Sequence, residues 1–363
     1  MIKIYDFSNN ELSYKNGSYG GAAGSKDGIV INGEEWMIKY PKSLSQMEGE
    51  NASYSTAPLS EFLGSHIYSI LGYDVHDTML GIRNNKLVVA CKDFATDGKM
   101  LLEIRTIKNH VNSELFDIAE KRGLGSSETH IVDLNELMLH LDKNPILANI
   151  EGIKQRFFEQ AIIDVFINNN DRNNGNWGII REKGKNDRLA PIFDNGGSFS
   201  TKMSEKKILK MTYSHEIKNN VLNVLTAYGE NEHKFNAKKF FSKVEGDACF
   251  QNAIVSVTEN IKAHMDDILS LLDSIPEHVE DKNKRVYEVC SGIRKNFYKY
   301  QLKTRFENLL MPECEKVKRH NHSENHLGYM DEFDVSDGSD ELNDIDVPAN
   351  NEPDDLDDEN LDI

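Results

Sequence analysis

The segments Asp171-Arg172-Asn173-Asn174-Gly175-Asn176 and Leu189-Ala190-Pro191-Ile192-Phe193-Asp194-Asn195-Gly196 constrain this chain more than any other part of its sequence. The first holds an aspartate and, five residues later, an asparagine. The second ends in Asp-x-Gly and follows a stretch that reads as a short hairpin. Asp171, Asn176 and Asp194 therefore offer two carboxylates and one carboxamide at a defined spacing.

This spacing is typical of a protein-kinase catalytic loop followed by its metal-binding loop. Phosphoryl transfer needs little covalent help and much positioning, so one carboxylate must orient the attacking hydroxyl while other oxygens hold magnesium. We predict that Asp171 is the catalytic base and that Asn176 and Asp194 bind Mg²⁺, a metal that takes few protein oxygens besides water and phosphate.

Two other interpretations of the same loop stay open. Asn, Asp and Gly accumulate in surface turns that have no function. A calcium loop would place ligands at Asp171, Asn173 and Glu182, but its sixth position is Asn176 where such a loop needs glycine.

Upstream, the segment Gly20-Gly21-Ala22-Ala23-Gly24-Ser25-Lys26-Asp27-Gly28 precedes an expected strand. Glycines let backbone N–H groups approach phosphates that side chains would hold away. Residues 36–40 alternate as in a strand, which places Lys39 on it, and residues 58–72 read as a helix that carries Glu61. Lys39 can reach the α- and β-phosphates of ATP, and Glu61 can pair with it.

The pattern along the whole chain predicts an α+β, bilobal, protein-kinase-like fold. Residues 1–95 read as a small, sheet-rich N-lobe and residues 96–312 as a mainly helical C-lobe with the catalytic and metal-binding loops. Residues 313–363 read as a polar linker and a disordered acidic tail, because their few apolar side chains cannot offset chain entropy. We expect helices around residues 110–122, 133–142, 153–168, 216–228, 250–273 and 285–310.

The charge of the chain gathers at its C-terminal end. Of 60 acidic residues, 15 lie within 331–363, which holds no Lys or Arg, so residues 1–330 carry 45 acidic against 42 basic groups. A nearly neutral body lacks the clustered basic face that nucleic acid requires. We therefore expect no direct nucleic-acid binding.

The remaining composition indicates a cytoplasmic protein. Its four cysteines lie far apart and form no CxxC pair, as is usual for reduced thiols. The N-terminal residues lack the apolar run of a signal peptide, and no segment reaches the ~18 apolar residues of a membrane span. We expect no membrane partner, and secretion as an effector stays open.

Taken together, these motifs resemble those of the HipA-like family of serine/threonine kinases, above all its compact CtkA-like members, which correspond to the HipA C-terminal domain. The resemblance spans roughly residues 15–310. It rests on the glycine-rich loop with Lys26, on Trp-Met-Ile-Lys-Tyr-Pro at 36–41, on Leu-Ser-Glu-Phe-Leu-Gly at 59–64, on Asn-Asp-Arg-Asn-Asn-Gly-Asn-Trp-Gly at 170–178 and on Ala-Pro-Ile-Phe-Asp at 190–194.

The resemblance implies a kinase fold with ATP in its cleft and a protein substrate that carries a Ser or Thr hydroxyl. It also implies autophosphorylation in the glycine-rich loop, with Ser18 the first candidate and Ser25 the second, and in some members toxicity relieved by a DNA-binding antitoxin. Carried over by position, it assigns catalysis to Asp171 with Lys39 and Glu61, and magnesium to Asn176 and Asp194. It assigns nucleotide contacts to Gly20, Gly21, Gly24, Lys26, Lys39, Cys91 and Phe94.

The chain departs from the family pattern at several points. Asn173 stands where many relatives have His, and Asn195 occupies the middle of the Asp-x-Gly, so the Phe-driven packing switch of ordinary protein kinases does not follow. The full-length toxin also has a separate N-terminal lobe, whereas this chain begins some twenty residues before its glycine-rich loop. This puts antitoxin binding through that lobe in doubt, and an antitoxin or other regulatory partner stays open.

Two alternative functions share the same machinery. A small-molecule or lipid kinase on this fold would use the same phosphate-binding groups, and the substrate that accepts phosphate separates the two. A nucleotide-binding pseudokinase would act as an interaction protein, and the complete set of Lys39, Asp171, Asn176 and Asp194 argues against it.

Overall fold

The computed structural model describes residues 1–19, 26–45, 53–109, 131–231 and 233–328, with side chains as far as residue 320. Its contacts divide the chain into two units, residues 1–319 and 320–363. Of the second unit, residues 320–328 are described, and they are helical. Several predicted features lie outside the described residues: Gly20, Gly21, Gly24, Ser25, the expected helix at 110–122 and the acidic tail from residue 329.

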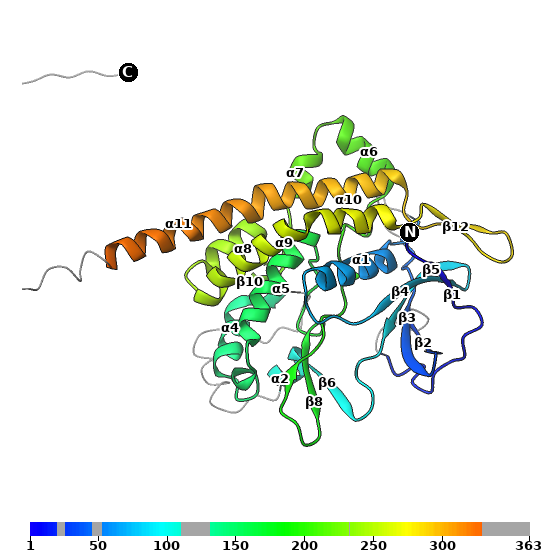
Figure 1. Ribbon diagram of the computed structural model, residues 1–363, viewed down its shortest axis with the longest axis horizontal. Helices are drawn as coiled ribbons and strands as arrows, with labels where there is room; N and C mark the ends of the chain where they lie inside the picture. The colour runs from blue at the N-terminus through cyan, green and yellow to red at the C-terminus, as the bar shows by residue number, and fades with distance from the viewer. Residues whose placement is uncertain (20–25, 46–52, 110–130, 232, 329–363) are drawn as a thin grey trace, which may run out of the picture. The chain divides into compact units, whose positions relative to one another are not determined.

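A five-stranded sheet with the order β1-β4-β5-β3-β2 forms the N-terminal part of the chain (Figure 1). Neighbouring strands are antiparallel except β1 and β4, which are parallel. On β3, Trp36 and Ile38 are buried, as the alternation predicts, and Lys39 lies opposite Lys26 of β2. The strands are β1 (Tyr5–Asp6), β2 (Lys26–Ile31), β3 (Glu34–Lys39), β4 (Thr78–Arg83) and β5 (Lys86–Lys92).

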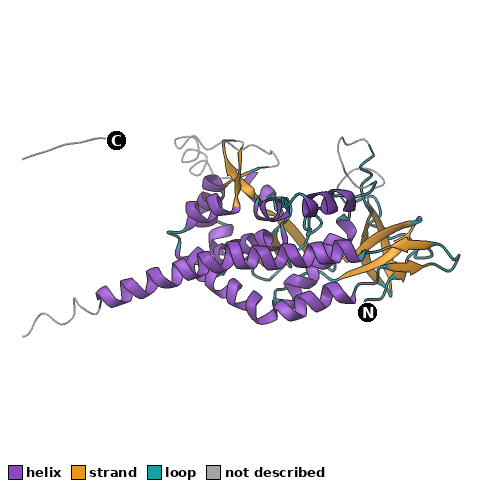
Figure 2. Ribbon diagram, turned by 90° about the horizontal axis from the view of Figure 1, so that it is seen from above, coloured by secondary structure: helices purple, strands orange, loops and turns teal. Residues whose placement is uncertain are grey.

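Three smaller sheets accompany the helical part of the chain, as Figure 2 shows by colour. The most important for the site is the antiparallel trio β6-β8-β9, because the β8–β9 hairpin separates the two predicted loops. The strands are β6 (Lys99–Glu103), β7 (Val132–Asp133), β8 (Gly178–Glu182), β9 (Arg188–Leu189), β10 (Leu225–Glu230), β11 (His233–Asn236), β12 (His278–Glu280) and β13 (Val286–Glu288).

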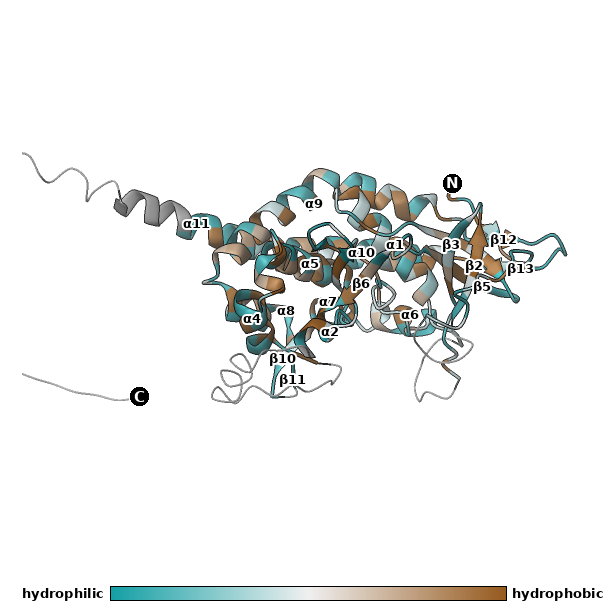
Figure 3. Cartoon of the chain, turned by 90° about the horizontal axis from the view of Figure 1, so that it is seen from below, coloured by the Kyte–Doolittle hydropathy of each residue, from teal (hydrophilic) through white to brown (hydrophobic). Residues whose placement is uncertain are grey.

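Helices make up most of the described residues beyond residue 103. In hydropathy colours, α9 carries both hydrophobic and hydrophilic residues along its length, as a helix at a core boundary does (Figure 3). The α-helices are α1 (Ala57–Ile70), α2 (Ile104–Asn109), α4 (Leu134–Lys143), α5 (Ile153–Ile167), α6 (Glu205–Tyr213), α7 (Ile217–Leu222), α8 (Ala237–Val244), α9 (Ala248–Ser274), α10 (Gly292–Arg305) and α11 (Met311–Gly328), joined by the 3-10 turn η1 (Leu147–Asn149) and the π-helical turn η2 (Phe306–Leu310).

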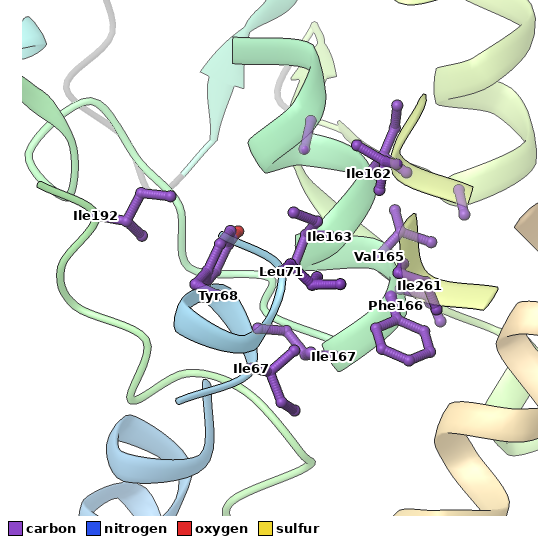
Figure 4. Packing of buried hydrophobic residues seen from close by; sticks show 14 of the residues in the cluster. Ile67, Tyr68, Leu71, Ile162, Ile163, Val165, Phe166, Ile167, Ile192 and Ile261 are labelled. Atoms are coloured by element: carbon purple, nitrogen blue, oxygen red, sulfur yellow. The ribbon is translucent and has the colours of Figure 1, made fainter. Parts of the chain in front are cut away.

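One continuous core joins the sheet-side helix α1 to the helical part. Figure 4 shows Ile67 and Tyr68 of α1, with Leu71 directly after it, near Ile163 and Ile167 of α5, and all five side chains are buried. Helix α5 is apolar around most of its circumference because it also packs against α9. The predicted helix at 153–168 is thus confirmed as the central element, and it ends directly before the catalytic loop.

Three sequence expectations were wrong in part. Residues 225–230 form strand β10 and 286–288 form strand β13, so the expected helices at 216–228 and 285–310 are shorter. The short apolar runs there do not distinguish strand from helix by periodicity. The polar linker expected from residue 313 is helical up to residue 328, because Cys314 and Val317 of α11 are buried in the main core.

Among the described residues, no helix combines the length and the apolar character that a bilayer crossing needs.

A chain cut after Pro312 should therefore be less stable than a chain cut after Gly328. The shorter chain loses the buried Cys314 and Val317, and burying two such side chains contributes on the order of 3 kcal/mol. Denaturant unfolding of the two truncated chains measures the difference. Equal midpoints and slopes would contradict the packing role of α11.

Candidate active site

Lys39 and Glu61 form a buried ion pair beside the sheet. Lys39 leaves the end of β3 and Glu61 lies on α1, with Lys39 Nζ 2.7 Å from Glu61 Oε2. His76 Nε2 lies 3.0 Å from the other carboxylate oxygen, Oε1, which also accepts the backbone N–H of Asn195 at 3.0 Å. Burial alone would raise the pKa of Glu61, but Lys39 and His76 hold it well below its usual range. Glu61 is thus a fixed anion that holds Lys39 in place.

Asp194 meets Lys39 from the opposite side. Its Oδ1 lies 2.9 Å from Lys39 Nζ, and its side chain is 37% exposed. Burial would lower the pKa of Lys39, yet Asp194 and Glu61 together keep this pKa well above the ordinary value, so the ammonium stays charged. The backbone φ of Asp194 is 58°, a left-handed conformation that few residues other than glycine adopt. Such local strain is common at functional sites.

Asn195 and Arg172 join the metal-binding loop to the catalytic loop. Arg172 Nη2 donates to Asn195 Oδ1 at 2.6 Å, and its Nη1 donates to the carbonyls of Asn176, at 2.9 Å, and Phe193. The guanidinium also forms a two-point ion pair with Asp164 of α5, through Nε at 2.9 Å and Nη2 at 3.1 Å. The two loops are thus fixed to each other and to α5.

The catalytic loop presents Asp171 at its start. The backbone N–H of Asp171 donates to Asn169 Oδ1 at 3.3 Å, and Asn173 Nδ2 donates to Asp171 Oδ1 at 3.4 Å. Gly197 passes so close that a Cβ there would come within 2.9 Å of Asp171 Cβ. These contacts fix the base of the side chain while its carboxylate lines a cavity.

Asn176 is held by its own loop. Its Nδ2 donates to the carbonyl of Asp171 at 2.6 Å, so Oδ1 is the atom left for other partners. A carboxamide oxygen together with a carboxylate such as that of Asp194 is a donor set that would suit Mg²⁺. Both residues line the same cavity.

A cavity of about 620 Å³ extends from these residues between the sheet and the helical part. Of the predicted nucleotide contacts, Lys26, Lys39, Cys91 and Phe94 line it, as do Asn176 and Asp194. Burial raises the pKa of the Cys91 thiol, which therefore stays protonated. The ring of Phe94 is tilted against that of Phe193, with centroids 5.6 Å apart. A cavity of this volume, lined by both apolar and charged side chains, is suited to a nucleotide.

Residues that the sequence analysis missed close the outer side of this cavity. Lys15 Nζ lies 2.7 Å from Asp93 Oδ2, and Tyr19 OH donates to the same oxygen at 3.0 Å. This pair ties the segment before the glycine-rich loop to the residues that follow β5. Ser18 lies on that segment, exposed, with its Oγ donating to the Lys15 carbonyl at 2.6 Å. No motif spacing in the sequence indicates these contacts.

A second missed residue, Lys234 of β11, approaches the catalytic loop from a distant part of the chain. Its Nζ donates to the carbonyl of Asn170 at 2.7 Å, directly before Asp171.

A group of three potential metal ligands lies elsewhere in the site: one ligand atom each of Glu61, His76 and Cys91, all within 4.8 Å of one another. Since Lys39, His76 and Asn195 already occupy the Glu61 carboxylate, we assign no metal to that cluster.

The Lys-Glu pair, the paired loops and the cavity between them define a phosphotransferase site of the protein-kinase type. Among curated proteins, the chain is 30% identical over 275 residues to the serine/threonine-protein kinase CtkA of Helicobacter pylori, covering 75% of this chain and 79% of the relative. No family model matches. The chain therefore belongs to the CtkA-like serine/threonine kinases, as the sequence predicts.

One solved structure agrees with this assignment. The crystal structure of CtkA, a proinflammatory kinase of H. pylori, superposes with a TM-score of 0.73 at 25% identity, over 87% of this chain and 98% of that one. The predicted kinase-like α+β fold is confirmed by this match. A complex of Shewanella oneidensis HipA with HipB and operator DNA matches with a TM-score of 0.48 at 13% identity, over 83% of this chain and 67% of that one.

Gly64→Ala should damage the site although it lies on α1. A Cβ at Gly64 would come within 2.7 Å of Asn195 Cβ, and Asn195 holds both Glu61 and Arg172. Alanine favours a helix by up to ~1 kcal/mol over glycine, whereas overpacking typically costs about 1–3 kcal/mol. We expect lower thermal stability and slower phosphoryl transfer. Gly246→Ala, where a Cβ meets nothing within 4 Å, is the matched control, and equal behaviour of the two variants would refute the argument.

Proposed function

We propose that the chain transfers the γ-phosphoryl group of ATP to a Ser or Thr hydroxyl of a protein substrate and that it needs Mg²⁺. The observation that carries this proposal is the placement of Lys39, paired with both Glu61 and Asp194, where two cavities meet. Ordinary turn residues or a calcium loop would not require that arrangement. Membership of a serine/threonine-kinase family supports the same activity.

The residues present fit a magnesium–nucleotide complex. Asn176 and Asp194 would hold the metal, and Lys26 and Lys39 would bind phosphate oxygens beside it. When bound, magnesium would neutralise charge on the phosphates. Lys39 Nζ lies 2.9 Å from Asp194 Oδ1. The nucleotide would therefore bind beside an ion pair in which Lys39 contacts its phosphates and Asp194 holds its metal.

Asp171 would act on the acceptor. It orients the incoming hydroxyl and takes its proton while the oxygen forms a bond to the γ-phosphorus, and the bond from that phosphorus to the bridging oxygen breaks as ADP leaves. Arg172, fully buried beneath the loop, keeps Asp171 and Asn176 in register. In this mechanism Glu61 contributes indirectly, by holding Lys39.

Further parts of the proposal concern regulation and location. Autophosphorylation would fall on the segment before or within the glycine-rich loop, with Ser18 first and Ser25 second, and a phosphate there would repel the nucleotide.

The lobe boundary would lie near residue 95. The four free cysteines agree with a cytoplasmic protein. An antitoxin partner remains a prediction, as does the absence of direct nucleic-acid binding.

Asp171→Asn should reduce phosphoryl transfer by ~10²–10⁴-fold, because the amide cannot accept the hydroxyl proton. The variant should keep its fold and nearly normal nucleotide affinity. The assay is incubation with γ-labelled ATP and magnesium, followed by mapping of the labelled residues. Asp266→Asn, at an exposed position of α9 that lines neither cavity, is the control. Wild-type turnover in Asp171→Asn would exclude the role of base.

Asp194→Ala should weaken magnesium-dependent ATP binding by about tenfold or more, since one charge-assisted contact is worth about 1.5–3 kcal/mol. Calorimetric titration with ATP, with and without magnesium, measures the effect. The loss should be smaller without the metal, because part of the contact runs through it. Equal losses under both conditions would contradict metal binding at Asp194.

A further inference from the structure

A second cavity, of about 630 Å³, adjoins the nucleotide cavity. Lys26, Lys39 and Asp194 line both, whereas Asp171 lines the second and Asn176, Cys91 and Phe94 line the first. The shared residues therefore mark the point at which a phosphoryl group would leave one cavity for the other. Because Asp171 faces the second cavity, that cavity is where an acceptor hydroxyl would bind.

The lining of this second cavity is rich in lysine. Its carboxylates are Glu61, Asp171 and Asp194, and the first and third of these already pair with Lys39. Its lysines are Lys26, Lys39, Lys42, Lys202 and Lys234. Since residues 1–330 as a whole are close to neutral, so many cations around one hollow are a local feature rather than a consequence of composition.

Three of these lysines face the second cavity and not the nucleotide cavity: Lys42, Lys202 and Lys234. None of them forms an ion pair with any described residue. Lys42 and Lys202 are exposed, while Lys234 is half-buried. Burial lowers the pKa of Lys234 although the nearby Asp171 carboxylate opposes this shift, and its one hydrogen bond within the described chain goes to the Asn170 carbonyl. A half-buried ammonium with a single hydrogen bond and no ion pair among the described residues is stabilised further when another anion binds beside it.

We propose that this cavity binds an acidic segment of the protein substrate, with Asp or Glu side chains beside the acceptor Ser or Thr held by Lys42, Lys202 and Lys234. The inference rests on the proposed function and specifies its substrate class. The three lysines come from three separate segments: the loop after β3, the loop before α6, and β11. The cationic lining is therefore built from parts of the chain that are distant in sequence and that meet at this cavity.

The test is a peptide-phosphorylation assay with three matched peptides. Each has one central Ser, flanked by Asp, by Ala or by Lys, and kcat/KM is measured with the full chain. We expect the order Asp, then Ala, then Lys. Each exposed lysine should contribute about two- to fivefold, the value of an exposed ion pair, and the preference should shrink in high salt.

Variants identify the residues responsible. Lys42→Ala, Lys202→Ala and Lys234→Met should each lower the ratio of kcat/KM for the Asp peptide to that for the Ala peptide. Lys218→Ala, at an exposed position of α7 that lines neither cavity, should leave the ratio unchanged. Using a ratio separates lost recognition from a general loss of folded enzyme.

The outcomes distinguish the two proposals. Phosphorylation of the peptides without preference for Asp, or a preference that the three lysine variants keep, overturns the acidic-substrate inference and leaves the kinase proposal standing. No transfer to any peptide or to the protein itself overturns the proposed function. Efficient transfer to a small anionic alcohol such as an inositol phosphate, with none to the peptides, also overturns the acidic-peptide inference.

Discussion

The buried ion pair between Arg172 and Asp164 is the interaction on which the site depends. Both side chains are almost fully buried, and Asp164 also accepts from Tyr68 and Asn169. Removing one partner of such a pair typically costs 3–5 kcal/mol, because the other charge is left uncompensated. The pair therefore adds little net stability, but neither residue can be replaced alone without leaving a buried, unpaired charge.

The Arg172–Asp164 pair matters for the site because it connects the catalytic loop to the core. Asp164 lies on α5, the most buried helix, and Arg172 lies in the loop that follows it. From Arg172 the hydrogen bonds pass to Asn195, and from Asn195 to Glu61 and to Ser65 of α1. The core of the helical part is thus connected through polar groups to Lys39 on the sheet. The residues proposed as base, metal ligands and phosphate-binding lysine therefore share one framework.

The candidate catalytic residues and the strand that carries Lys39 could be predicted from the sequence, because the spacing of the motif is typical of kinase chemistry. Asp171, Asn176 and Asp194 stand at fixed distances along the chain, and the period of two places Lys39 on a strand. Contacts between distant segments carry no such signal. Nothing in the sequence around Lys234 indicates that β11 contacts Asn170. Residues 313–328 are mostly polar, so their composition does not predict that Cys314 and Val317 pack α11 into the core.

Asn195 has a consequence for inhibitor chemistry. In ordinary protein kinases the middle residue of the Asp-x-Gly is a Phe whose packing distinguishes active from inactive states. Here it is a fully buried asparagine whose side-chain amide bonds to Arg172 and Ser65, whose backbone N–H donates to Glu61, and whose Cβ packs against Gly64. Turning the side chain outward would break its two hydrogen bonds and leave a buried guanidinium short of an acceptor. Some kinase inhibitors bind the pocket that opens when this Phe is displaced, and an asparagine at this position provides no such pocket. Selective ligands for this enzyme should therefore be directed to the nucleotide cavity or to the lysine-lined cavity next to it.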